Sequence, residues 1–205
     1  MLRVGLTGGL ASGKSFVGRA LADLGCLVIR ADDLGHQVLE PGGEAYEGVI
    51  QEFGPGIIKE DGAPDKVIDR RKLAELVFHD RERLAKLSAL VHPPVRAREG
   101  QLLDEYAAMH PHGIGVVEAA ILVETGNYRD YAKLIVAVCR EEQQIERALA
   151  RDGMTREQVL DRLSRQMPLA EKIKYADYVI DTSGAKDNTL AQTRVVYQTL
   201  AALNP

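Results

Sequence analysis

Short apolar runs along the chain are separated by stretches with helical spacing. The first run, residues 2–6, alternates between apolar and other positions and breaks at Thr7 and Gly8, which predicts a strand that ends in a glycine loop. Continuous apolar runs are typical of parallel strands that are buried on both faces. Four more such runs lie at residues 26–29, 114–117, 134–138 and 178–180. Five strands separated by helical patterns predict an α/β fold, a parallel five-stranded sheet flanked by helices.

The segments between these runs differ greatly in length. Apolar residues from Phe16 to Leu24 have helical spacing, and Gly25 is expected to end that helix. Between Ile29 and Ile114 lie 84 residues, far more than the dozen or so that a crossover connection needs. Their pattern is helical, so we expect an inserted helical lobe over about residues 35–110 that holds a substrate. We expect His92-Pro93-Pro94 to end a helix there, because the residue before a proline disfavours helical geometry.

A second long connection separates the last two strands. Between Val138 and Tyr178 lie 39 residues, and Gly153 divides them into two helical segments. Thr155 and Gln158 have the spacing of a capping box at the start of the second helix. Two helices joined by a tight turn predict a mobile lid over about residues 140–175. We therefore expect a single domain over residues 1–205, with its core at about 1–34, 111–139 and 176–205.

The segment Gly8–Ser15 matches G-x-x-x-x-G-K-[ST] at every defined position. Backbone N–H groups can close around phosphate oxygens in such a loop, because glycine leaves room for the curl. Lys14 can reach the β- and γ-phosphates, and the Ser15 hydroxyl can ligate Mg²⁺. An ordinary glycine turn would match by chance in on the order of one chain in a hundred. The position between a predicted strand and a predicted helix therefore favours a phosphate loop.

Acidic residues follow two of the predicted strands, where ligands of open α/β sheets bind. Asp32 and Asp33 come just after residues 26–29. We expect Asp32 to orient or accept the proton of an attacking hydroxyl, with Asp33 as a cap or a solvated residue. The alternative is that one of them only caps the following helix. Glu118 ends another apolar run, and two interpretations stay open for it: support of Mg²⁺, or an isolated acid at a strand end.

The predicted lid is rich in arginine. Arg147 and Arg151 are one helical turn apart and so share a face. Arginines that close over a site can neutralise charge on a transferring phosphoryl group and exclude water. Acidic residues are interleaved with them, so a solvated helix face is the simpler interpretation for most, and we expect one or two to be functional. The full set is Arg140, Arg147, Arg151, Arg156, Arg162 and Arg165.

Charge and composition narrow the class of protein. The chain has 26 basic and 30 acidic residues, a net charge of −4, which disfavours a nucleic-acid partner. Cys26 and Cys139 lie in apolar surroundings, as expected for reduced thiols in a reducing compartment. Neither a targeting segment nor an apolar run near the roughly 20 residues that span a bilayer is evident. We expect a cytoplasmic protein with no membrane partner, and the oligomeric state stays open.

The phosphate loop occurs in several protein classes. Guanine-specific switches use an N-K-x-D element, and none of Asn127, Asn188 and Asn204 begins one. The sequence after residue 117 is Glu-Ala-Ala-Ile rather than the D-x-x-G of a GTPase switch. An early phosphate loop, an inserted lobe and an arginine-rich lid instead favour a small-molecule kinase.

Many short elements of the chain follow one another in a family-specific order and spacing. They are residues 5–9 with the phosphate loop, Ala31-Asp32, Glu40-Pro41-Gly42, Asp69-Arg70, Leu73, Phe78, His92-Pro93, Leu122-Val123-Glu124, residues 144–147, Arg151-Asp152-Gly153, Arg162, Gln166, Lys172 and residues 176–180. From Val4 to about Gly184 the chain thereby resembles the dephospho-CoA kinase family. Three positions depart from the usual family pattern: Arg30, Ala120 and Thr182.

The resemblance implies an activity and site residues. The family transfers the γ-phosphate of ATP to the ribose 3′-hydroxyl of dephospho-CoA, with Mg²⁺, on a P-loop core with an acceptor-binding lobe and a lid. By resemblance, Asp32 orients or deprotonates the 3′-hydroxyl, and Arg147, with Arg151 nearby in the lid, faces the phosphoryl groups. The implied ATP-binding residues are Gly8, Ala11, Ser12, Gly13, Lys14, Ser15 and Phe16, and the implied acceptor-binding residues are Thr7, Arg70, His92 and Glu124.

Two other functions remain open from the sequence. A kinase for another nucleotide or small alcohol would share the phosphate loop and the lid. A nucleotide-binding regulator without turnover is disfavoured, because a pure binder needs no acid on the acceptor side.

Overall fold

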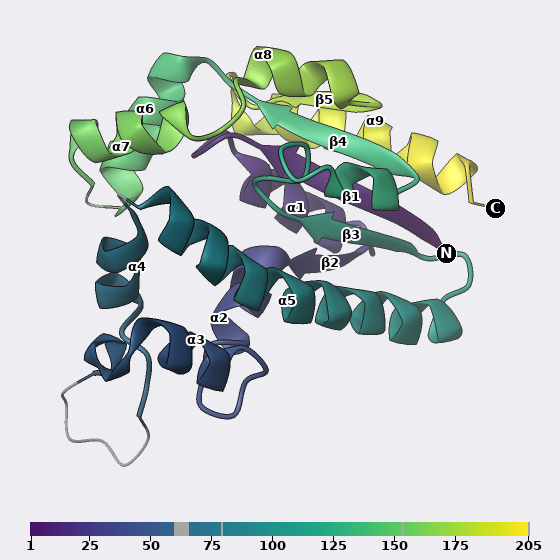
Figure 1. The fold of residues 1–205 in the computed structure, drawn as a ribbon. Helices are drawn as coiled ribbons and strands as arrows, with labels where there is room; N and C mark the ends of the chain where they lie inside the picture. The colour runs from purple at the N-terminus through teal and green to yellow at the C-terminus, as the bar shows by residue number, and fades with distance from the viewer. Residues whose placement is uncertain (60–65, 79, 153, 205) are drawn as a thin grey trace. The chain divides into compact units, whose positions relative to one another are not determined.

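The computed structural model describes residues 1–59, 66–78, 80–152 and 154–204 (Figure 1). The chain divides into two compact units. One, here called the sheet unit, consists of Met1–Arg30 and Leu103–Pro205, and the other, the inserted unit, is Ala31–Leu102. Within the described residues, no helix combines the length and the apolar character needed to cross a membrane.

The sheet unit is built on five parallel strands in the order β2-β3-β1-β4-β5. This confirms the predicted α/β fold. The register places Leu6 of β1 beside Glu118 of β3, and Arg30 of β2 beside the same glutamate on its other side. The carboxyl ends of the three strands therefore meet at one edge. The strands are β1 (Leu2–Gly8), β2 (Leu27–Arg30), β3 (Ile114–Glu118), β4 (Lys133–Val138) and β5 (Tyr178–Asp181).

Helices cover the sheet because strand side chains alternate between its faces. Val4 and Leu6 of β1 pack in one buried cluster with Val17 of α1 and Leu200 of α9. Glycine at position 115 of β3 leaves room for Leu103. The helical elements of the unit are α1 (Lys14–Asp23), η2 (Asn127–Asp130), α6 (Glu141–Asp152), α7 (Arg156–Ser164), α8 (Leu169–Lys172), η3 (Ile173–Tyr175) and α9 (Lys186–Ala202).

The connection between β4 and β5 forms the helices expected there. Thr155 accepts a hydrogen bond from the Gln158 backbone, and the Gln158 side chain accepts one from the Thr155 backbone, which confirms the capping box. Gly153, where we expected the division, lies outside the described residues. Ile145, Ala148 and Val159 form a small buried cluster that joins α6 to α7, and Leu10 of the glycine loop packs against it.

The inserted unit is helical, as expected. Its elements are α2 (Ala31–Gln37), α3 (Tyr46–Phe53), η1 (Pro55–Ile57), α4 (Arg70–Phe78) and the first part of α5 (Arg81–Met109). The expected helix end at residues 92–94 is wrong, because α5 continues through Pro93 and Pro94. Each proline removes a backbone donor, but Val95 and Leu103 beyond them are buried, so packing of the later turns holds the helix.

Candidate active site

The glycine loop leaves β1 at Gly8 and enters α1 at Lys14. Gly13 has φ +84°, and a Cβ there would lie 2.8–2.9 Å from side-chain atoms of Thr182. A Cβ at Gly8 would lie 2.6 Å from the Ala137 carbonyl oxygen. Both positions need glycine for space, and Gly13 needs it for its backbone angle as well. The amino end of α1 behind the loop supplies N–H groups and partial positive charge for a phosphate.

Glu118 joins the loop from the neighbouring strand. Its side chain is 3% exposed, and Oε1 accepts hydrogen bonds from Lys14 Nζ at 3.1 Å and from Ser15 Oγ at 2.6 Å. Arg30 Nε lies 3.9 Å from the other carboxylate oxygen. A Cβ at Gly18 would lie 2.7 Å from that oxygen, so the bare glycine of α1 leaves room for the carboxylate. Glu118 is therefore part of the phosphate-loop site and not an isolated strand-end acid.

The Ser15 hydroxyl and the Glu118 carboxylate fit a magnesium ion. Their oxygens lie 2.6 Å apart, and oxygen is the ligand type that Mg²⁺ prefers. Among the residues that the structure describes, no group of three or more His, Cys, Asp or Glu side chains is placed to hold a metal ion. A magnesium ion at this position would thus depend on phosphate oxygens and water for its other ligands, as is usual in phosphotransferases.

Arg147 of α6 contacts the loop through Thr182. Its Nη1 donates to Thr182 Oγ1 at 3.1 Å and its Nη2 to the Thr182 carbonyl at 2.7 Å. Thr182 Oγ1 in turn donates to the Ser12 carbonyl at 2.7 Å. The structure therefore brings Arg147 to the phosphate loop. Arg151 lies in the same helix, and its side chain is outside the described part of the chain.

Two residues expected to bind the acceptor lie in intramolecular hydrogen bonds of the sheet unit. The Thr7 side chain is buried, and Oγ1 donates to the Ala120 carbonyl at 3.1 Å. Glu124 Oε1 accepts from Lys172 Nζ at 2.9 Å and from the Met167 backbone N–H at 3.0 Å. Of the remaining loop residues, Ala11 and Phe16 are half-buried and Ser12 is buried.

The other candidate residues belong to the inserted unit. Asp32 and Asp33 lie in the first turn of α2, which begins at Ala31. Asp32 is exposed, and carboxylates in the first turn are favoured by the helix dipole. Arg70 is the exposed first residue of α4. Partial desolvation, with the charge of Arg96, lowers the pKa of His92 in α5.

Three polar residues near the loop have contacts that the sequence patterns did not predict. Gln144, Gln166 and Lys172 all contact backbone atoms of residues 8–10. Thr182, considered from the sequence only as a departure from the family, links Arg147 to the loop. The contact of Gln144 could have been suspected from the sequence. This polar residue is four positions before Ala148 and next to Ile145, so it lies on the apolar face of its helix, and all three residues are buried in the structure.

Comparisons with known proteins show the family of this chain. A family model described as dephospho-CoA kinase matches residues 2–188. The chain is 42% identical to a dephospho-CoA kinase of Aquifex aeolicus, over 98% of each chain. A solved dephospho-CoA kinase from Campylobacter jejuni is 28% identical, with a TM-score of 0.70 over 99% of this chain and 98% of that one. A shikimate kinase from Bacteroides thetaiotaomicron, 12% identical with a TM-score of 0.52 over 97% of this chain and 98% of that one, shares the fold alone. The match of the family model over residues 2–188 and the 42% identity over 98% of the chain show that this chain belongs to the dephospho-CoA kinase family.

Proposed function

We propose that this chain transfers the γ-phosphate of ATP to the ribose 3′-hydroxyl of dephospho-CoA, forming coenzyme A and ADP. The observation that carries the proposal is the site itself: Lys14 and Ser15 of the phosphate loop converge on the buried Glu118, in a chain whose residues 2–188 match the family model. The two free thiols support work in a reducing compartment, the cytoplasm.

On the nucleotide side, the chain binds and orients the phosphates. Backbone N–H groups of residues 11–16 surround them, with Gly8 and Gly13 providing the space. Lys14 places its ammonium on the β- and γ-phosphates, using N–H donors other than the one that Glu118 accepts. Mg²⁺, held by Ser15 Oγ and the Glu118 carboxylate, would neutralise charge that develops on the phosphates during transfer.

On the acceptor side, Asp32 is the proposed base. It follows the last residue of β2 by two positions in the chain, and ligands of open parallel sheets bind beyond the carboxyl ends of the strands. Its carboxylate orients the 3′-hydroxyl and takes up its proton as the oxygen attacks phosphorus. We assign acceptor binding to the inserted unit, with Arg70 and His92 as candidate contacts.

Arg147 is the proposed cation of the lid formed by α6 and α7. Thr182 holds its guanidinium with two hydrogen bonds. The guanidinium is thereby oriented beside the loop, where its positive charge and its remaining N–H donors can stabilise charge on the equatorial oxygens of the transferring group. Closure of the lid over both substrates would exclude water and suppress hydrolysis of ATP.

An ADP-release assay with MgATP tests the proposal. Dephospho-CoA is compared with AMP, adenosine and pantetheine phosphate as acceptors, and the product is identified by mass. We expect ADP formation that depends on dephospho-CoA and yields coenzyme A. Preference for another acceptor would instead favour a kinase for a different nucleotide or small alcohol, and nucleotide binding without transfer would contradict a kinase.

A further inference from the structure

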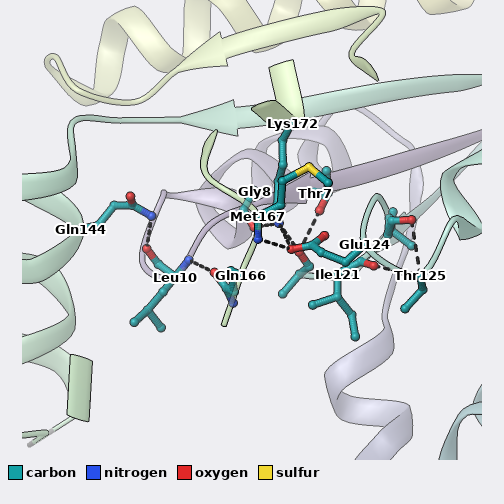
Figure 2. Close-up of polar contacts among 12 residues, drawn as sticks. Thr7, Gly8, Leu10, Ile121, Glu124, Thr125, Gln144, Gln166, Met167 and Lys172 are labelled. Atoms are coloured by element: carbon teal, nitrogen blue, oxygen red, sulfur yellow. Dashed lines mark hydrogen bonds and ion pairs between the residues drawn. The ribbon is translucent and has the colours of Figure 1, made fainter. Parts of the chain in front are cut away.

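Lys172 is the last residue of α8, and its side chain is 0% exposed. Its Nζ atom donates to three oxygens: the Ala120 carbonyl at 2.7 Å, and Glu124 Oε1 at 2.9 Å and the Gly8 carbonyl at 3.3 Å, both residues being labelled in Figure 2. An ammonium has three N–H donors, so all of them are used. Moving a charged group from water into the protein interior costs free energy even when the charge is paired. If Lys172 only filled space, an apolar side chain would do so without this cost.

Burial and two charged neighbours, Lys14 and Glu124, act on the ammonium group of Lys172. Burial lowers the pKa of Lys172, and the positive charge of Lys14 lowers it further. The hydrogen bond and the negative charge of Glu124 oppose both effects. Lys172 is thus a second cation near Lys14, and it contacts the loop at the Gly8 carbonyl.

A second set of contacts holds the same loop at Leu10. The Leu10 N–H donates to Gln166 Oε1 at 2.8 Å, and the Leu10 carbonyl accepts from Gln144 Nε2 at 2.7 Å (Figure 2). Both polar backbone groups of Leu10 are therefore bound by glutamines. Gln144 lies in the first turn of α6 and Gln166 follows α7, so two separate parts of the predicted lid bind the same loop residue.

The two sets are connected through Glu124. Its Oε1 atom accepts both from Lys172 and from the backbone N–H of Met167, the neighbour of Gln166. The segment Gln166–Lys172, which leads from α7 back to the core, is consequently bound to the loop at Gly8 and at Leu10. A displacement of α7 would therefore move Gln166, and through the hydrogen bond between Gln166 and the Leu10 N–H it would also move the loop.

We propose that Lys172 is a positioning residue for the phosphate loop, and that it acts with Gln166 by holding the segment Gln166–Lys172 against Gly8 and Leu10. The proposal rests on the proposed function in that it takes this loop as the site of the ATP phosphates. It predicts that loss of the Lys172 ammonium weakens ATP binding more than it weakens binding of the acceptor.

The test compares Lys172→Met with Lys174→Met. Lys174 is two residues further along and pairs with Glu171 on the surface, so it is a matched control for the same substitution. We expect Lys172→Met to raise the Kd for MgADP and the KM for ATP by about 10-fold to 100-fold, because misplacing binding groups by about 1 Å costs up to that much. The KM for dephospho-CoA should change less than threefold, and Lys174→Met should behave as wild type.

Gln166→Ala provides a second test that leaves the buried ion pair intact. It removes the acceptor of the Leu10 N–H, so amide exchange of Leu10 should become faster and the KM for ATP should rise by about 3-fold to 10-fold. If Lys172→Met does not fold, this variant decides. Folded variants with wild-type ATP binding and wild-type Leu10 exchange would overturn the proposal. A wild-type protein that binds ATP but forms no coenzyme A would overturn the proposed function instead.

Discussion

Replacement of Glu118 with glutamine removes one buried negative charge and keeps the shape of the side chain. In the structure this carboxylate engages Lys14 and Ser15, the two side chains that the phosphate loop offers to a nucleotide. A bound phosphate must compete with this carboxylate for the hydrogen bonds of Lys14 and Ser15, and the negative charge of the carboxylate repels it. We therefore expect Glu118→Gln to bind nucleotide more tightly than wild type when no magnesium is present.

The expected size follows from the distances. A phosphate oxygen bound to Lys14 would lie about 3 Å from Nζ, and Nζ lies 3.1 Å from Glu118 Oε1. The two negative charges would then be at most about 6 Å apart, where they repel by about 3 kcal/mol at an effective dielectric constant of about 20. This corresponds to a factor of about 100 in Kd. Because salt and residual water weaken the repulsion, we expect at least a 10-fold tightening.

Calorimetric titration of ATP in EDTA and in excess Mg²⁺ measures the effect. The variant should bind metal-free ATP more tightly, gain less from Mg²⁺ than wild type does, and lose kcat/KM, since one of the two oxygen ligands is weakened. Glu171→Gln, which removes a surface carboxylate paired with Lys174, serves as the control and should change none of these. Unchanged or weaker binding of metal-free ATP by a folded Glu118→Gln variant would refute the reasoning.

Four further outcomes are expected. Asp32→Asn should lower kcat by about 10²-fold to 10⁴-fold, the usual contribution of a general base, with nearly unchanged ATP binding in an equilibrium titration; a loss confined to ATP affinity would contradict the assignment. Lys14→Met should weaken nucleotide binding and turnover together in steady-state kinetics, because the charge on the β- and γ-phosphates is lost, and wild-type turnover would exclude the phosphate-loop role. Amide exchange in residues 140–175 should slow when both substrates are bound, whereas unchanged exchange would argue against lid closure. Burial raises the pKa of Cys26 from its ordinary 9.0 to about 11. The thiolate fraction of Cys26 at pH 8 is therefore about 100-fold lower than that of an ordinary thiol, and DTNB should label it slowly in the folded protein. The same shift makes the free energy of unfolding fall as the pH rises from 9.0 towards about 11, because only the unfolded thiol loses its proton in that range.

The arrangement of strands could be predicted because the signals are local. Each of the five apolar runs became a strand, and continuous apolar character implied a parallel sheet with both faces covered. The phosphate loop was equally clear, since glycine, lysine and serine at fixed spacing have a direct physical purpose. The helix end expected at Pro93 was wrong because burial of Val95 and Leu103 outweighs a local preference against helix.

By itself, the sequence determined the fold class, the phosphate loop and the family. The tertiary structure decided which side chains serve that loop. Glu118 had two open interpretations until the structure showed its hydrogen bonds with Lys14 and Ser15. Lys172, 164 positions after Gly8, binds the loop without any local signal, because a hydrogen bond depends on distance in space. Side chains that reach a site from distant parts of the chain are specified by packing, and packing cannot be derived from spacing along the sequence.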